Sequence, residues 1–362
     1  MAAYTTIDDP SAYFKVQLYT GDGSTPSITF DDTDTDMQPD LVWIKNRDQA
    51  DSHCLFDAVR GATEMLNPDT DTVEVTDADT LTSFDSDGFA LGADVKVNTN
   101  TEKYVSWNWK ANGTGSSNTD GSINTTATSA NTTSGFSIST YTGTGSAATI
   151  GHGLGSIPKM IILKSRVGTD IWAVYNIGMT SAPETDFMSM ARTDATSDSD
   201  TFWNDTAPTS TVFSVGTSAD INDSGDTNVA YCFAEKQGFS KFGSYVGNGD
   251  GSSDENGPFI YTGFRPAFVI TKSIDSTTAW LIFDTKRLGY NPSNNRLYTQ
   301  VAAAEGAAGA STDSIDFLSN GFKIKTTITS TSHANKSGDT YIYMAFAEAP
   351  FVNSNGVPCN AR

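Results

Sequence analysis

The sequence has few of the residues on which catalytic and metal sites commonly depend. It holds three cysteines and three histidines among 362 residues, too few and too scattered for a disulfide framework or a zinc site. No Gly-x-Ser-x-Gly elbow accompanies the histidines, so a Ser-His-Asp hydrolase is not indicated. We expect His152, which lies between two glycines, to be a turn residue. The sequence therefore predicts a protein that is not an enzyme.

Positive charge and long apolar runs are also scarce. Lys and Arg number 22 against 43 Asp and Glu, which gives a net charge of −21. Phosphate backbones and anionic membranes repel such a chain, so we expect no nucleic-acid partner. The absence of any apolar run of about 18 residues predicts no membrane insertion. The N-terminus also lacks the basic start and apolar core of a signal peptide, which predicts that the protein folds in a cytoplasm even if it works elsewhere.

The residues that are abundant favour strands. Hydrophobic residues make up 37% of the chain and charged residues 18%, and the remainder is rich in Thr, Ser, Asn and Gly. This composition is typical of strands with polar outer faces joined by many turns. Only residues 57–66 and 301–310 show a helical pattern, and two glycines weaken the second. We therefore predict an all-β fold.

One pattern occurs three times along the chain. Tyr-Thr/Val-Gly-x-Gly leads to a Pro, and the Pro begins an apolar strand that ends in Lys. The copies span residues 19–45, 141–164 and 245–272. The short apolar run at 41–44 is typical of a strand covered on both faces. The Gly-x-Gly is expected to form a turn, because the third glycine and the helix of a dinucleotide site are missing.

The repeats predict three tandem β-sandwich domains of jelly-roll or concanavalin-like type, at about 100 residues each. We place them at 1–112, 135–237 and 238–362, the last with a short C-terminal tail. A polar Gly/Ser/Thr/Asn linker, 113–134, separates the first two. The second junction has almost no spacer, so repeats two and three should pack as a rigid pair. Three similar domains in one chain could also imitate a trimer on a threefold site.

Two features are candidate binding sites. Asp32, Asp34 and Asp36 alternate as in part of a calcium loop, but the closing Gly and distal Glu are missing. A solvated acidic turn is favoured there, with Ca²⁺ as the alternative and no other cofactor expected. Most tryptophans lie in the repeated strands and suit a core. Trp203 lies in a polar stretch and is the best candidate for an exposed aromatic that stacks on a glycan.

Seven segments resemble virion structural proteins of tailed phages, many from marine bacteria. These segments are Tyr-Thr-Thr-Ile-Asp-Asp-Pro-Ser-Ala-Tyr-Phe (4–14), Pro-Asp-Leu-Val-Trp-Ile-Lys (39–45), Phe-Asp-Ala-Val-Arg-Gly-Ala (56–62), Phe-Asp-Ser-Asp-Gly-Phe (84–89), Ala-Tyr-Cys-Phe-Ala-Glu-Lys-Gln-Gly (230–238), Tyr-Thr-Gly-Phe-Arg-Pro (261–266) and Tyr-Met-Ala-Phe-Ala-Glu-Ala-Pro-Phe (343–351). The resemblance covers almost the whole chain and brings no catalytic residues with it.

The resemblance implies a non-enzymatic virion protein with tandem β-sandwich modules on the particle surface. We expect a tail appendage or fibre protein that contacts the host surface, with a glycan as the host ligand. A capsid decoration protein is the first alternative, and a polysaccharide-degrading tail protein is the second. The expected partners are other tail or capsid proteins, with the chain present as a homo-oligomer or in many copies.

Overall fold

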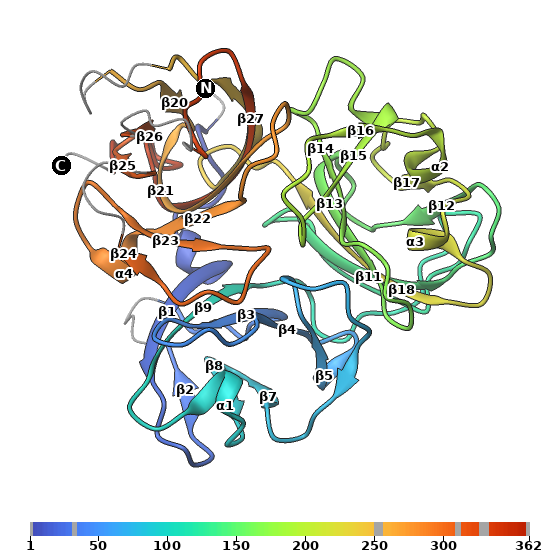
Figure 1. The fold of residues 1–362 in the computed structure, drawn as a ribbon, viewed down its shortest axis with the longest axis horizontal. Coiled ribbons are helices and arrows are strands. Elements are labelled where there is room, and N and C mark those ends of the chain that lie inside the picture. The colour runs from blue at the N-terminus through green and yellow to red at the C-terminus, as the bar shows by residue number, and fades with distance from the viewer. Residues whose placement is uncertain (1–2, 31–34, 250–255, 308–312, 326–332, 360–362) are drawn as a thin grey trace.

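The computed structural model describes residues 3–30, 35–249, 256–307, 313–325 and 333–359 (Figure 1). All ladders between its strands are antiparallel, and the helices within these ranges are single turns of three or four residues. The predicted all-β sandwich class is confirmed. No helix in the described ranges is long and apolar enough to cross a membrane.

The strands form three structural repeats, each with a large sheet that packs on a small one. Repeat 1 contains η1 (Pro10–Ala12), β1 (Phe14–Thr20), β2 (Ser27–Thr29), β3 (Leu41–Asn46), β4 (Cys54–Asp57), β5 (Gly61–Leu66), β6 (Val75–Thr76), β7 (Leu81–Asp85), β8 (Gly88–Leu91), α1 (Val95–Asn98) and β9 (Lys103–Trp109). Its large sheet has the order β1-β9-β3-β4-β5-β6 and its small sheet the order β2-β8-β7.

Repeat 3 follows the same strand order as repeat 1, and repeat 2 follows it with one more edge strand in its large sheet and one strand fewer in its small sheet. Repeat 2 contains β10 (Ala127–Asn131), β11 (Phe136–Thr142), β12 (Ala148–Gly151), β13 (Pro158–Ser165), β14 (Ala173–Asn176), η2 (Pro183–Thr185), β15 (Asp186–Ser189), β16 (Ser197–Asp198), α2 (Asp200–Trp203), β17 (Val212–Val215), α3 (Ala219–Asn222) and β18 (Thr227–Ala234). Repeat 3 contains β19 (Ser240–Val246), β20 (Phe259–Tyr261), β21 (Phe264–Ser273), β22 (Leu281–Asp284), α4 (Thr285–Leu288), β23 (Asn295–Tyr298), β24 (Gly306–Ala307), β25 (Ile315–Leu318), β26 (Gly321–Ile324) and β27 (Thr340–Pro350). The large sheets have the orders β10-β11-β18-β13-β14-β15-β16 and β19-β27-β21-β22-β23-β24.

The three large sheets turn one face toward a shared centre, as Figure 1 shows. Trp109, Phe233 and Phe346 occupy matching positions on β9, β18 and β27 and meet there. Their ring centroids form a triangle with sides of 6.4, 5.7 and 6.0 Å. An apolar void of only about 20 Å³ lies beside them. The repeats therefore form a closed ring around a pseudo-threefold axis that aromatic side chains fill.

The middle strand of each large sheet is buried on both faces, which confirms the prediction for residues 41–44. In β3, Leu41 and Trp43 join the shared core, whereas Val42 and Ile44 pack beneath the small sheet of repeat 1. The inner core of repeat 3 is continuous with the shared core. All three repeats contribute to this one core, so it does not separate them from one another. The predicted division of the chain into separate domains therefore stays a prediction.

Two expectations about local structure are wrong. The predicted linker, 113–134, contains strand β10, which pairs along its length with β11. Thr128 and Ser129 of β10 are buried, and the Thr128 hydroxyl lies 2.9 Å from that of Ser139, whereas residues 113–124 are exposed or half-buried. The predicted helix at 57–66 is a turn followed by β5.

The second predicted helix, 301–310, also differs from the structure. Gly306 and Ala307 form the short edge strand β24. Residues 308–310 lie outside the described part of the chain.

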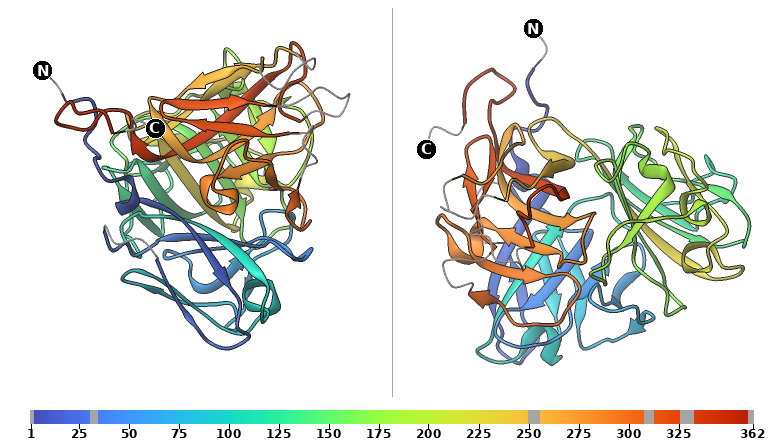
Figure 2. Two further views of the ribbon diagram at one scale, coloured as in Figure 1. Left: turned by 90° about the vertical axis from the view of Figure 1, so that its left-hand side faces the viewer. Right: turned by 45° about the horizontal axis from the view of Figure 1, so that its top comes forward.

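The N-terminal segment packs on repeat 3, and both ends of the chain lie on the same side of the molecule (Figure 2). Thr5 Oγ1 donates to the carbonyl of Gln237 at 2.8 Å, and Tyr4 donates to the carbonyl of Gly263 at 2.8 Å. The Ser354 amide donates to Asp8 at 2.6 Å. These contacts join the first residues of the chain to its last repeat and to the junction that precedes it.

Candidate functional site

The repeated Tyr-x-Gly-x-Gly pattern is a structural anchor. In repeat 1, Tyr19 donates to the Val97 carbonyl at 2.8 Å, and the Asp22 amide donates to Asn98 Oδ1 at 2.9 Å. A Cβ on Gly21 would lie 2.2 Å from a backbone oxygen, so glycine is required for this close approach. The same contacts recur around Tyr141, Gly143 and Asn222 and around Tyr245, Gly247 and Asn335.

The lysine that ends each apolar strand is fully buried and closes the turn that follows it. Lys45 Nζ donates to two backbone carbonyls at 2.5 and 3.0 Å, Lys164 Nζ at 2.8 and 2.9 Å, and Lys272 Nζ at 2.5 and 3.3 Å. Burial lowers the pKa of each of these lysines to about 8. Because the same arrangement occurs three times inside turns, we assign these amines to the fold.

The ring is closed by one backbone hydrogen bond that is repeated at every interface between repeats. It joins the Glu74 amide to the Arg166 carbonyl at 2.9 Å, the Thr196 amide to the Ile274 carbonyl at 2.9 Å, and the Glu305 amide to the Arg47 carbonyl at 2.8 Å. We call these interfaces 1–2, 2–3 and 3–1 after the repeats that they join. The matching contacts make the arrangement cyclic.

Interface 3–1 surrounds the repeated hydrogen bond with a buried ion network. Arg47 pairs with Glu305 at 2.8 Å, and Glu305 pairs with Arg287 at 3.2 Å. Arg287 in turn pairs with Asp284 at 2.5 Å, and Asp284 accepts the indole N–H of Trp107 at 3.2 Å. The network therefore extends from the surface of repeat 1 through repeat 3 and back to the core of repeat 1.

Interface 1–2 has the same network at equivalent positions. Arg166 pairs with Glu74 at 2.5 Å, and Glu74 pairs with Arg60 at 2.7 Å. Arg60 pairs with Asp57 at 2.5 Å, and Asp57 accepts the hydroxyl of Tyr231 at 2.7 Å. Interface 2–3 places Ile274, Thr196, Met179, Asn176 and Met344 at the matching positions, so the charges are absent there.

The interface between repeats 1 and 3 also contains the largest cleft that we describe, with a volume of about 410 Å³. This volume falls within the range of about 300–1,000 Å³ that is usual for ligand sites. Strand β1 forms one wall, and β21, α4 and the end of β27 form the other. Its lining residues are Ser11, Phe14, Lys15, Val16, Arg265, Ala267, Thr285, Lys286, Gly289, Ala347 and Glu348.

Three basic residues and one acid line this cleft, although the whole chain is strongly acidic. Arg265 lies on β21, and its Nε donates to Glu348 at 2.9 Å. The two Nη atoms of Arg265 have no hydrogen-bond partner within the described part of the chain. Lys15 is held by the Thr35 carbonyl at 2.6 Å and lies 3.8 Å from Asp87. Arg265 therefore offers two donor nitrogens to a ligand in this cleft.

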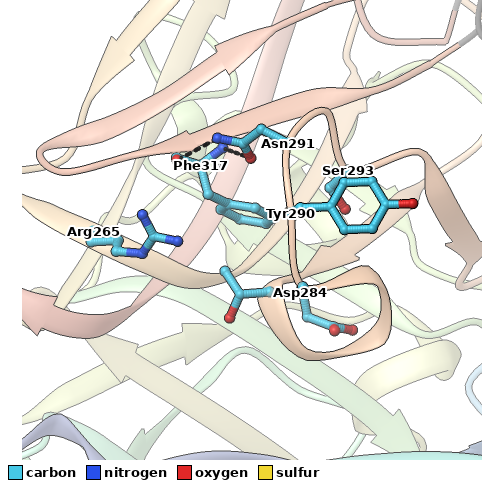
Figure 3. Close-up of a pocket in the computed structure, with 8 residues that line it drawn as sticks. Arg265, Asp284, Tyr290, Asn291, Ser293 and Phe317 are labelled. Atoms are coloured by element: carbon cyan, nitrogen blue, oxygen red, sulfur yellow. Dashed lines mark hydrogen bonds between the residues drawn. The ribbon is translucent and has the colours of Figure 1, made fainter. Parts of the chain in front are cut away.

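A smaller cavity of about 50 Å³ adjoins the cleft and shares Arg265 with it (Figure 3). The loop after α4 forms its wall, and Asn291 fixes that loop with two hydrogen bonds of 2.9 Å to the backbone of Phe317. Tyr290 is 69% exposed at the rim. Ser293 is buried, and its hydroxyl has no hydrogen-bond partner among the described residues. A guanidinium, a buried hydroxyl and an exposed aromatic ring therefore line one small cavity.

The acids near this site are already paired. Asp284 lines the smaller cavity, but its Oδ1 accepts two backbone amides of α4. Its Oδ2 accepts Arg287 and Trp107. Glu348 pairs with Arg265. Glycoside hydrolysis needs one carboxyl group as a proton donor and a second that is free to act on the sugar. Neither acid is placed for such a role.

The structure does not support the predicted glycan contact at Trp203. This residue is 2% exposed, and its indole N–H donates to the Asp186 carbonyl at 3.0 Å. It packs edge-on against Tyr175 at 6.0 Å. The single turn α2 points Trp203 into the core of repeat 2, and its polar neighbours Asn204 and Asp205 remain outside. The expectation of exposure was wrong because the flanking residues are polar while one side of the turn is buried.

The remaining candidates give no assembled site. Asp32 and Asp34 lie outside the described residues, and Asp36 is exposed. Among the described residues, no group of three or more acidic, His or Cys side chains is arranged to hold a metal ion. His152 is buried in a turn, where its Nδ1 accepts the Leu154 amide at 3.2 Å and its Nε2 lies 3.2 Å from the Thr209 carbonyl.

Sequence reasoning did not single out the cleft residues. The available signal was the residue before the strand proline, which is Gln38 in the first copy, Ile157 in the second and Arg265 in the third. Alignment of the three copies would have marked Arg265 as the basic exception. Tyr290, an aromatic residue within a Gly-Tyr-Asn-Pro turn, was a second signal of exposure.

Residues 9–350 match the family model described as Domain of unknown function (DUF7483), and the chain therefore belongs to this family. No curated protein and no solved structure gives a significant match. The family description names no activity, so the function must be argued from the ring and the cleft.

Proposed function

We propose that this chain is a non-enzymatic structural protein exposed on a tailed-phage particle. We place it on a tail appendage that contacts the host surface, with a glycan as the host ligand. The closed ring of three repeats is the observation that carries the proposal. The segments that resemble virion proteins of tailed phages add support from the sequence.

The ring supports a structural role through its symmetry. Homo-oligomers with a threefold axis repeat one interface three times, and this chain repeats the hydrogen bond from Glu74 to Arg166 in the same way. One chain can therefore occupy a threefold position that would otherwise take three subunits. Because interface 2–3 lacks the charges of the other two, the interfaces remain distinguishable, and a single interface, 3–1, can carry the host-binding cleft.

The absence of activity is supported by the paired acids of the cleft. Asp284 and Glu348 are both bound to arginines, so the polysaccharide-degrading alternative lacks a free acid and base there. Incubation of the folded protein with host capsule or lipopolysaccharide is expected to release no new reducing ends. Release that exceeds a heat-denatured control would overturn the non-enzymatic assignment.

A capsid decoration protein is the second candidate, and the same ring favours it. A pseudo-threefold unit also fits the threefold positions of a capsid lattice. The net charge of −21 would then protect the particles from aggregation.

Cryo-electron microscopy of the intact particle tests both candidates. Density for the ring at the tail tip or on a fibre would support the tail appendage. Density across the capsid lattice would favour decoration and remove the host-contact role. A particle that lacks the chain altogether, by density and by mass spectrometry, would overturn the proposal.

A further inference from the structure

We propose that the cleft between repeats 1 and 3 binds an acidic sugar, with Arg265 pairing with the sugar carboxylate. This inference rests on the proposed contact with a host-surface glycan, and it names the class of ligand that the contact would take. Three features of the cleft carry it: an arginine with unpaired terminal nitrogens, a buried hydroxyl without a partner, and an exposed aromatic ring.

Arg265 is held in place and still has donors to offer. Its Nε is fixed by Glu348 at 2.9 Å, and its guanidinium points into the pocket in Figure 3. The two Nη groups have no partner among the described residues. A guanidinium presents parallel N–H groups whose spacing matches the two oxygens of a carboxylate. A sugar carboxylate can therefore pair with both Nη groups of this arginine at once.

The neighbouring loop supplies contacts for the rest of a sugar. Ser293 places a buried hydroxyl beside the cavity, and that hydroxyl has no hydrogen bond to a described residue. Buried polar groups usually have a partner, because burying a polar group without a hydrogen bond costs its desolvation free energy. A sugar hydroxyl would supply that partner. The ring of Tyr290, 69% exposed at the rim, offers a face on which a sugar ring can stack.

The negative charge of the chain does not prevent this binding. Charges farther away than about 8 Å are largely screened at physiological ionic strength. The cleft itself is lined by Lys15, Arg265 and Lys286 against the single acid Glu348. The residues that match Arg265 in repeats 1 and 2 are Gln38 and Ile157. We therefore expect one such site on each chain, between repeats 3 and 1.

The test measures binding of a trimer of galacturonic acid to the purified full chain by isothermal titration calorimetry. The neutral trimer of galactose is the matched ligand. We expect the acidic trimer to bind, and Arg265→Gln to weaken its binding about 10- to 100-fold, which is the usual worth of a hydrogen bond to a charged group. Tyr290→Ala should weaken it about three- to tenfold. High salt should weaken binding to the wild type more than to Arg265→Gln.

Arg192→Gln is the matched control variant, because Arg192 is an exposed arginine of repeat 2 that pairs with Asp71 at 2.7 Å outside the cleft. It should bind the acidic trimer as the wild type does. Equal binding by Arg265→Gln in a folded sample, equal binding of the neutral trimer, or no binding at millimolar ligand would overturn the inference. If binding fails while the chain is found on the tail, the proposed function stands and only the ligand class is wrong. Absence from the particle overturns the proposed function whatever the sugar does.

Discussion

The three interfaces of the ring share one backbone frame but fill it in two different ways. Interfaces 1–2 and 3–1 each hold two arginines and two acids, of which one arginine and the aspartate are fully buried, together with a Tyr or Trp donor. Interface 2–3 has Met344 where the others have Trp107 and Tyr231, and it has Asn176 where they have aspartate. Interface 2–3 thus lacks both the Tyr or Trp donor and the aspartate acceptor, so no buried charge is left unpaired there.

This difference shows that the ring does not need the ion networks in order to close. Burying an ion pair costs desolvation free energy that roughly cancels the attraction, so such pairs add little net stability. They strongly penalise a wrong partner, because a buried charge without its counterpart is costly. We infer that the networks set the order of the repeats around the axis, and that the apolar contacts supply the stability.

Breaking the ion network of one interface should give the largest loss of stability. Asp57→Ala removes the fully buried one of the two carboxylates that pair with Arg60, leaving only Glu74, and it also removes the acceptor of Tyr231. We expect a loss of about 3–5 kcal/mol in the free energy of unfolding, measured by urea denaturation. Asn176→Ala changes the equivalent position of interface 2–3, where the side chain accepts one amide at 2.8 Å, and it should cost about 1 kcal/mol. Equal losses in the two variants would contradict the distinction between the interfaces.

The buried lysine that ends the apolar strand is common to all three repeats, so it should change the pH dependence of stability equally in each. Lys45, Lys164 and Lys272 have pKa values lowered to about 8 by burial, against about 10.4 in an unfolded chain. Between these values the unfolded state holds more protons, so each lysine makes stability rise with pH, by up to about 1.4 kcal/mol per pH unit. Replacing any one of them by Met should remove the same slope, measured by denaturation between pH 8 and 10.5. A slope lost in only one repeat would show that the lysines are not equivalent.

The ion network at interface 1–2 should also make the free energy of unfolding depend on pH in the acid range. Burial alone would raise the pKa of Glu74, but hydrogen bonds and charge from Arg166 and Arg60 hold it below its usual range. The stability gained from this depressed pKa is present above about pH 4.5 and is lost as pH falls further. Glu74→Gln should therefore flatten the fall in stability between pH 5 and 3. Thr196→Val, at the matching position of interface 2–3, should leave that fall unchanged, and an identical fall in Glu74→Gln would refute the assignment.

Local patterns in the sequence were enough to predict the β class, the repeats and the doubly buried strands. These local patterns failed where contacts with residues far away in the sequence decide the structure. Residues 57–66 have a helical composition, and Asp57 does accept the Val59 and Arg60 amides as a helix cap would. The chain nevertheless continues as strand β5, because Gly61 adopts φ 118° and the following residues pair with β4. The turn imitates the start of a helix.

The candidate site was harder to predict, because its residues come from elements that are far apart in the sequence. Arg265 and Glu348 are far apart in the sequence and meet only through the pairing of β21 with β27. The polar sequence around Trp203 favoured exposure, but burial depends on which side of a single turn faces the core. Comparison among the three internal copies would have been more informative than the composition of any one copy.

The smallest expected change in stability comes from giving interface 1–2 the residues of interface 2–3. The variant Asp57→Asn, Arg60→Met, Glu74→Thr, Arg166→Ile and Tyr231→Met gives interface 1–2 the residues of interface 2–3. Because the whole network is removed together, no charge is left buried without a partner, and stability should stay within about 1 kcal/mol of the wild type. Urea denaturation measures the change, with Asp57→Ala alone as the comparison. If the graft is as unstable as the single variant, the networks supply stability directly. If it is as stable as the wild type but also populates misassembled species on size-exclusion chromatography after refolding, the networks act in ordering the ring.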